Sequence, residues 1–218
     1  MAMKPQVGVI GLGKFGYKFG MTLLNLGHNV LGIDYQKENI NKAKNTFSQI
    51  FEADATQKQA LEQIGVSDMT HVLVSVGNSI SASAMISMYL KELSVQNVWV
   101  KAMNEDHAKL LQKVGADEVI IPEYLAAEQL AYRIDMPGLI EKLSFDPGLV
   151  IREMTVEKFA QKAIREIDLT NRYNSQIIAI KRYGESQYKF IPRADDILSQ
   201  GDVIIVIGDA EVLSKIRL

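Results

Sequence analysis

The sequence has no cysteine among its 218 residues. Disulfide bonds, thiolate zinc sites and cysteine nucleophiles are therefore excluded together. It also lacks an excess of positive charge: 24 Lys and Arg face 26 Asp and Glu, the net charge is −2, and no basic block stands out. Nucleic-acid binding through bulk electrostatics is therefore disfavoured.

Long apolar runs are missing as well. No run approaches the roughly 20 residues that a membrane-spanning helix needs, and the first residues, 1–6, have no apolar stretch typical of a secretory signal. We therefore expect a soluble protein, in which any membrane role is exerted through a partner.

The apolar content that is present suits a globular protein. Hydrophobic residues make up 47% of the chain and charged residues 23%, which are ordinary values for a folded domain. The length fits one domain of about 140 residues with a smaller one.

The first part of the chain alternates short β-rich runs with amphipathic stretches. This alternation predicts parallel β-α-β units with right-handed crossovers, and hence an α/β fold with a Rossmann-like, doubly wound sheet. We expect strands at 7–10, 29–33, 48–52, 71–76, 97–102 and 118–121, and helices at 14–26, 37–47, 58–64, 79–93 and 106–114.

The pattern changes after Pro122. Two helices, 123–134 and 139–143, are predicted on either side of a Pro-Gly breaker. Beyond a second breaker the chain becomes richer in β-type residues and predicts a small α+β domain with strands at 149–156, 176–182, 187–191 and 202–207. The expected organisation is therefore a nucleotide-binding domain at 1–121, a helix-turn-helix connector at 122–146 and a C-terminal domain at 147–218.

A glycine-rich loop, Gly11–Gly16, follows the first predicted strand and opens the first predicted helix. In such a loop Gly11 permits the tight turn, Gly13 lets the backbone approach a phosphate, and Gly16 lets the helix pack on the strand. Phosphate oxygens then meet free N–H groups at the positive end of the helix dipole. The competing interpretation is a glycine turn without a ligand.

An acid supports the phosphate interpretation. Asp34 ends the second predicted strand, where a carboxylate accepts hydrogen bonds from a ribose diol. The same carboxylate disfavours a 2′-phosphate by like-charge repulsion, so NADP is the less favoured ligand. Asp34 as a mere capping residue is the alternative.

Further polar residues stand where predicted strands end, which is where ligands bind in open α/β sheets. Lys101 follows an apolar strand and is a candidate cation for a phosphate. Lys14 is either a phosphate contact or a solvated first-turn lysine. Asp54, Asn78 and Ser79 are either ligand contacts or helix caps.

The order of several motifs carries a family resemblance. The motifs are the strings 9–16, 53–56, 98–102 with Asn104, 115–117 leading to Pro122 and Glu123, 166–169, 178–182 and 201–202. Together they are similar to the cytoplasmic gating subunits of bacterial potassium uptake systems, the KtrA/TrkA family with its RCK domains. The resemblance covers nearly the whole chain and is more specific than the glycine loop alone.

The resemblance implies a regulatory role. Such subunits bind ATP, ADP or NAD(H) at the glycine loop and assemble from homodimers into octameric rings on the cytoplasmic face of an integral membrane potassium transporter. It implies that Asp34 holds the ribose, that Lys101 holds a phosphate, and that Glu123 lies at the dimer interface and binds a divalent cation, Mg²⁺ or Ca²⁺. The other residues implied to line the nucleotide are Gly11, Gly13, Lys14, Phe15, Gly16, Asp54, Ala55, Val76, Gly77, Asn78 and His107.

Some relatives also bind cyclic di-AMP in the C-terminal domain, and no residue here is assigned to it. Lys14 stands where the family usually has arginine, and lysine cannot form a bidentate fork with phosphate. Asn174 replaces a usual glycine and tolerates the left-handed conformation fairly well.

Two other functions compete with the regulatory one. An NAD-dependent dehydrogenase needs a substrate domain and a positioned acid or base, and the C-terminal segment is short and contains no histidine. An assembly scaffold with an empty nucleotide site is the third hypothesis. We expect no enzyme activity.

Overall fold

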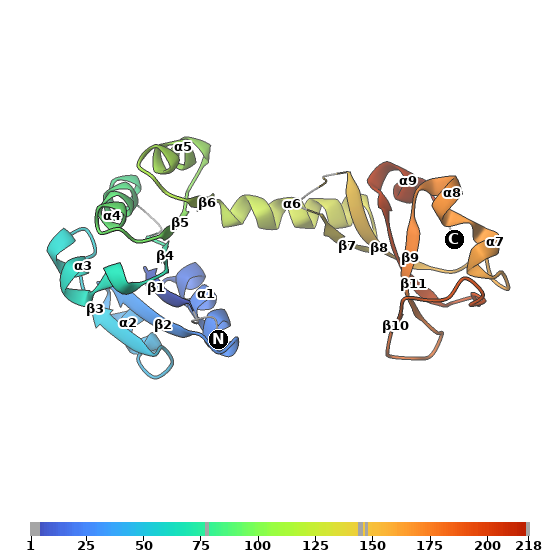
Figure 1. The fold of residues 1–218 in the computed structure, drawn as a ribbon, viewed down its shortest axis with the longest axis horizontal. Helices are drawn as coiled ribbons and strands as arrows, with labels where there is room; N and C mark the ends of the chain where they lie inside the picture. Colours follow the sequence, from blue (N-terminus) through green and yellow to red (C-terminus); the bar gives the residue numbers. More distant parts are fainter. Residues whose placement is uncertain (1–4, 77–78, 144–145, 147, 217–218) are drawn as a thin grey trace. The chain divides into compact units, whose positions relative to one another are not determined.

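The computed structural model describes residues 5–76, 79–143, 146 and 148–216. The chain divides into two compact units, residues 1–125 and 126–218 (Figure 1). Gly77 and Asn78, both predicted to line the nucleotide site, lie outside the described residues.

The first unit contains a parallel six-stranded sheet with the order β3-β2-β1-β4-β5-β6. The order reverses between β1 and β4, which is where doubly wound sheets form a crevice at the carboxyl ends of their strands. The expected Rossmann-like fold is thus confirmed. The strands are β1 (Gln6–Ile10), β2 (Asn29–Asp34), β3 (Gln49–Glu52), β4 (His71–Val74), β5 (Asn97–Lys101) and β6 (Glu118–Ile120), and the helices are α1 (Lys14–Asn25), α2 (Lys37–Ala43), α3 (Lys58–Ile64), η1 (Val66–Asp68), α4 (Ile80–Glu92) and α5 (Glu105–Lys113).

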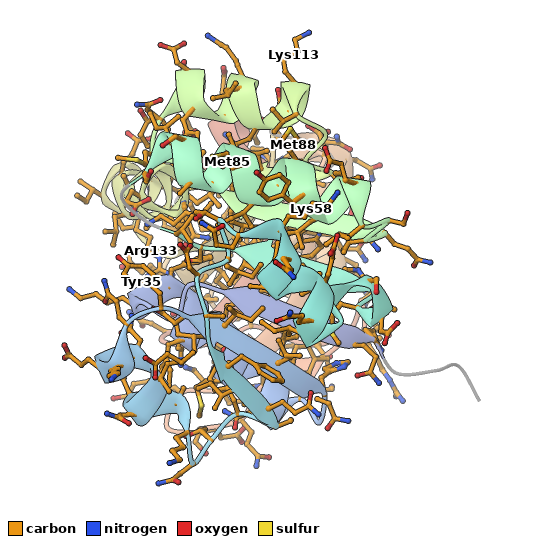
Figure 2. All side chains as sticks on the ribbon, turned by 90° about the vertical axis from the view of Figure 1, so that its left-hand side faces the viewer. Tyr35, Lys58, Met85, Met88, Lys113 and Arg133 are labelled. Carbon is orange, nitrogen blue, oxygen red and sulfur yellow. The ribbon has the colours of Figure 1, made fainter. Side chains whose placement is uncertain are left out.

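Helices cover both faces of this sheet, because successive strand residues point to opposite sides. On β1, Val9 packs in one apolar cluster with residues of α1 and α2, whereas Ile10 packs in a second cluster with residues of α3, α4 and α5. The predicted helix 37–47 is shorter than expected: α2 ends at Ala43, and Phe47 beyond it packs into the first cluster. Figure 2 shows the helices α3, α4 and α5 with their outer side chains, among them Lys58, Met85, Met88 and Lys113.

The second unit contains a five-stranded antiparallel sheet with the order β10-β9-β11-β8-β7. One side of it buries an apolar cluster with short helices, which gives the expected small α+β domain. The strands are β7 (Leu139–Lys142), β8 (Leu149–Thr155), β9 (Gln176–Lys181), β10 (Lys189–Phe190) and β11 (Val203–Asp209), and the helices are α7 (Ile164–Ile167), α8 (Leu169–Tyr173) and α9 (Ala210–Lys215). Helix α6 (Pro122–Asp135) begins in the first unit and ends in the second.

One predicted helix is wrong. Residues 139–143 were expected to form the second helix of the connector, but Leu139–Lys142 is strand β7, paired antiparallel with β8. Gly138 has a φ of +87°, and a side chain there would collide with the carbonyl oxygen of Glu153 on β8. The close approach of β8 therefore makes this segment an edge strand, and the described residues of the connector form a single helix, α6.

A buried carboxylate fixes the loops of the second unit. Asp202 is 1% exposed and accepts hydrogen bonds from the Arg182 guanidinium at 2.6 Å, from Ser199 N–H at 2.9 Å and from Tyr183 N–H at 3.0 Å. Burial alone would raise the pKa of Asp202, but these donors lower it overall.

Asn174 is the C-cap of α8 and has a φ of +46°, the left-handed conformation that asparagine was expected to tolerate.

Candidate functional site

A cleft of about 790 Å³ lies in the first unit, where strands β1, β2, β3, β4 and β5 end. Its size falls within the range of about 300–1,000 Å³ that small-molecule sites occupy. The predicted residues that line this cleft are Gly11, Gly13, Lys14, Phe15, Asp34, Asp54, Ala55, Val76 and Lys101.

The glycine loop has the local geometry that a phosphate site requires. Gly11 has a φ of +91°, and a Cβ there would lie 2.5 Å from the carbonyl oxygen of Ser75. A Cβ on Gly16 would overlap the carbonyl oxygen of Gly11, so Gly16 supports the packing of α1 and does not line the cleft. Among the described residues, no neighbouring atom lies within 4 Å of a Cβ built on Gly13, so this backbone faces open space.

The N-terminus of α1 is open to an anion. The first turn of a helix carries N–H groups without intrahelical partners. Gly13 is the N-cap and has no side chain that could cap the helix, and no acidic residue lies in the first turn of α1. Lys14, exposed in that turn, adds a positive charge beside the cleft. The helix dipole and these donors favour a bound phosphate.

Asp34 is 6% exposed and is held by three protein donors. Its Oδ2 accepts hydrogen bonds from Leu12 N–H at 2.6 Å and from the Asn39 side-chain amide at 2.9 Å, and its Oδ1 accepts one from Gln36 N–H at 2.8 Å. The carboxylate therefore joins the glycine loop to the turn between β2 and α2. Asp34 is at the edge of the cleft but is not simply a free acceptor.

Lys101 lines the cleft but already has a partner. Its Nζ lies 2.6 Å from Oε1 of Glu123, in the first turn of α6. The Lys101 side chain is 18% exposed, and that of Glu123 is 63% exposed. The hydrogen bond from Lys101 lowers the pKa of the Glu123 carboxyl. The pair thus links the cleft to α6, although Glu123 itself does not line the cleft.

The polar residues at the other strand ends are partly explained by local structure. Asp54 accepts hydrogen bonds from the Thr56 hydroxyl at 2.7 Å and from Thr56 N–H at 2.9 Å, and these bonds lower its pKa. Asp54 therefore shapes the loop after β3 as well as lining the cleft. Ser79 lines the cleft and also caps α4, accepting a hydrogen bond from Ala82 N–H.

His107 is not brought to the cleft. It is 1% exposed, its Nδ1 accepts a hydrogen bond from Met103 N–H at 3.2 Å, and its Nε2 lies 2.8 Å from the Ser83 hydroxyl on α4. Because Nδ1 is an acceptor, the ring is neutral with its hydrogen on Nε2. Burial lowers the pKa of His107, which agrees with the neutral form. In this structure His107 holds α5 to α4.

Several lining residues were not predicted. Tyr35 and Gln36 directly follow β2, so the rule that ligands meet strand ends could have found them. Asn39 lies further along, in α2, and only its contact with Asp34 identifies it. The unpredicted polar lining residues are Tyr35, Gln36, Asn39, Thr56 and Ser75.

Within the described residues, no group of three or more His, Cys, Asp or Glu is placed to hold a metal ion. In the same part of the chain, no helix has both the length and the apolar character that crossing a membrane requires.

Comparison with known proteins gives the family. The TrkA-N domain model matches residues 7–122, and the TrkA-C domain model matches residues 151–218. The chain belongs to the TrkA family. This TrkA-family chain is 31% identical over 211 residues to the Ktr system potassium uptake protein A of Bacillus subtilis, which covers 96% of this chain and 94% of that protein. The predicted resemblance is thereby confirmed.

Solved structures agree on the fold of this TrkA-family chain. The GsuK channel bound to NAD aligns with a TM-score of 0.56 at 22% identity, over 97% of this chain and 37% of that one. The GsuK structure bound to ADP aligns with a TM-score of 0.51 at 22% identity, over 60% of this chain and 34% of that one. This chain therefore spans about a third of the channel's length.

Proposed function

We propose that this chain is a nucleotide-sensing regulatory subunit of a potassium transporter and does not itself catalyse a reaction. The observation that carries the proposal is the cleft of about 790 Å³ on the glycine loop, in a chain that aligns almost from end to end with a potassium uptake protein. Binding in the cleft supplies the signal, and the transporter partner supplies the ion pathway.

The proposed ligand is an adenine nucleotide, ATP, ADP or NAD(H). The uncapped N-terminus of α1 and the cations Lys14 and Lys101 suit its phosphates, and Asp34 suits its ribose. The structural neighbours bound to NAD and to ADP support the same class of ligand. A nucleotide with a 2′-phosphate would meet the charge of Asp34 and is disfavoured.

The Lys101–Glu123 pair offers a route for the signal. A phosphate that takes Lys101 competes with Glu123, which lies in the first turn of α6. Helix α6 begins in the first unit and ends in the second, so in this proposal a displacement of its first turn is transmitted along the helix from one unit to the other. A nucleotide can shift such an equilibrium only by binding one state more tightly than the other.

Assembly into homodimers and octameric rings, on the cytoplasmic face of the membrane through the transporter, belongs to the same proposal. No residue of α6 is buried within the chain, and Leu125, Leu130 and Ile134 are among its exposed apolar residues. Such a helix suits an interface between copies. The domains at 1–121 and 147–218 and the connector between them are proposed as the parts of this assembly.

A divalent cation beside the nucleotide would need more than one chain. Glu123 is the carboxylate proposed to bind it, and Mg²⁺ and Ca²⁺ take six or more oxygen ligands. The remaining oxygens would come from the nucleotide phosphates, from water and from Glu123 of a second copy. Cyclic di-AMP binding by the C-terminal domain remains a proposal without assigned residues.

Two measurements test the function. Melting of the purified chain is followed with ATP, ADP, NAD, NADH and cyclic di-AMP, with and without Mg²⁺ or Ca²⁺, and at least one adenine nucleotide is expected to raise the melting temperature. Potassium flux into vesicles that contain the transporter and this chain is then expected to depend on that nucleotide. Flux that no nucleotide alters would refute the regulatory role. Sustained oxidation or reduction of a substrate with NAD would favour a dehydrogenase instead.

A further inference from the structure

The hydrogen bonds of Asp34 leave it too few acceptors for a whole ribose diol. A carboxylate has about four lone-pair sites, two on each oxygen. Oδ2 already accepts from Leu12 N–H and from Asn39, and Oδ1 accepts from Gln36 N–H. One site remains, on Oδ1. While these three donors stay in place, the carboxylate can accept a hydrogen bond from only one of the two ribose hydroxyls.

Asn39 has a further acceptor atom beside Asp34. Its amide nitrogen donates to Asp34 Oδ2 at 2.9 Å and to Gln36 Oε1 at 3.2 Å, which uses both of its hydrogens. An ionised carboxylate only accepts, so the atom of Asn39 that faces Asp34 is the nitrogen. Within the described residues, no donor is paired with the amide oxygen of Asn39, and Asn39 lines the cleft beside Asp34.

We propose that Asn39 is a specificity-determining residue of the nucleotide cleft, whose amide oxygen accepts the second ribose hydroxyl. This inference rests on the proposed function and adds to it the chemistry of the sugar site. Asp34 accepts one hydroxyl through its charged Oδ1, and Asn39 accepts the other through a neutral oxygen. The cleft therefore selects a ribose with both hydroxyls free.

The two hydrogen bonds differ in strength. Removing the ribose hydroxyl that donates to Asp34 is expected to weaken nucleotide binding more than tenfold, because hydrogen bonds to charged groups are the stronger ones. Removing the ribose hydroxyl that donates to the Asn39 amide oxygen is expected to weaken nucleotide binding roughly 3- to 10-fold. The native chain should thus penalise both 2′-deoxy-ADP and 3′-deoxy-ADP relative to ADP, to unequal extents.

The experiment is a calorimetric titration of the full chain with ADP, 2′-deoxy-ADP and 3′-deoxy-ADP. Asn39→Lys keeps a donor for Asp34 Oδ2 but has no acceptor, so it is expected to abolish the smaller of the two deoxy penalties and to keep the larger one. Asn41→Lys is the matched control, since it adds the same charge at an exposed residue of the same helix that does not line the cleft. Melting curves without ligand establish that both variants are folded.

The outcomes are distinguishable. Loss of one penalty in Asn39→Lys, with both kept in Asn41→Lys, supports the inference. If Asn39→Lys keeps both penalties, or weakens all three ligands equally, Asn39 does not contact the ribose and the inference is overturned while the proposed function stands. If the native chain binds none of the three, nor ATP or NADH, the proposed function itself fails.

Discussion

Replacing Glu123 with glutamine tests whether the cleft and α6 are coupled. In the proposed competition, a phosphate that binds Lys101 displaces Glu123, whose Oε1 lies 2.6 Å from Lys101 Nζ. Because the Glu123 side chain is 63% exposed, the pair has the character of a surface ion pair, worth about 0.2–1 kcal/mol. Without Mg²⁺, Glu123→Gln is therefore expected to tighten ADP binding by roughly 1.5- to 5-fold.

The opposite change follows when a divalent cation is present. If Glu123 also binds the cation beside the nucleotide, the same variant loses a ligand oxygen, and its affinity for ADP with Mg²⁺ should fall below the native value. Lys101→Met removes the proposed phosphate contact itself and should weaken ADP binding by about 10- to 150-fold with or without Mg²⁺.

The assay is calorimetric titration with ADP at low ionic strength, first with EDTA and then with Mg²⁺. Glu92→Gln is the matched control, because Glu92 forms a similar ion pair, 2.7 Å long, with Lys58 and does not line the cleft. Higher salt should reduce the gain in Glu123→Gln, since exposed pairs are screened. Unchanged or weaker ADP binding by Glu123→Gln in EDTA would refute the competition between phosphate and Glu123.

Three further variants test the site and the fold. Gly16→Ala places a methyl group against the Gly11 carbonyl. It should lower the free energy of unfolding by about 1–3 kcal/mol and abolish ADP binding. An unchanged melting temperature would contradict this packing. His107→Ala should lower the free energy of unfolding but change the Kd for ADP less than about 2-fold. It should also remove the pH dependence that His107 gives to the free energy of unfolding. Burial lowers the pKa of His107 from 6.5, so the unfolded chain binds the proton first and native stability falls as pH drops below 6.5. Asp202→Asn should lower the free energy of unfolding by about 3 kcal/mol at neutral pH. Because the folded-state pKa of Asp202 is lowered from 3.8, the difference between the native chain and the variant in urea unfolding should shrink as the pH falls below 3.8.

Much of the first unit could be predicted from the sequence, because its strands are buried apolar runs separated by clear helix signals. The glycine loop and Asp34 fell at a strand end, where the doubly wound topology places a ligand. Residues 139–143 were predicted wrongly, since a short apolar segment does not distinguish a helix from a strand by its period. Pairing with β8, which the sequence does not display, decides this segment.

The site itself was predicted less completely. His107 was expected in the cleft, but its placement depends on a hydrogen bond to Ser83 on another helix. Asn39 was missed because its importance comes from a contact with Asp34, and no motif announces it. Backbone-determined features follow from local sequence, whereas such side-chain partnerships depend on how separate elements pack.

The hydrogen bond from Leu12 N–H to Asp34 has a consequence for how related sequences are interpreted. An acid at the end of the second strand is usually taken as the mark of a ribose site. Here the carboxylate also accepts a hydrogen bond from the glycine loop, so the loop holds its conformation without a bound nucleotide. A relative that had lost its nucleotide would still need this acid to fold the loop. Its retention in a sequence is thus evidence for an intact loop first, and, under the proposal for Asn39, for a bound ribose only when a second acceptor lies beside it.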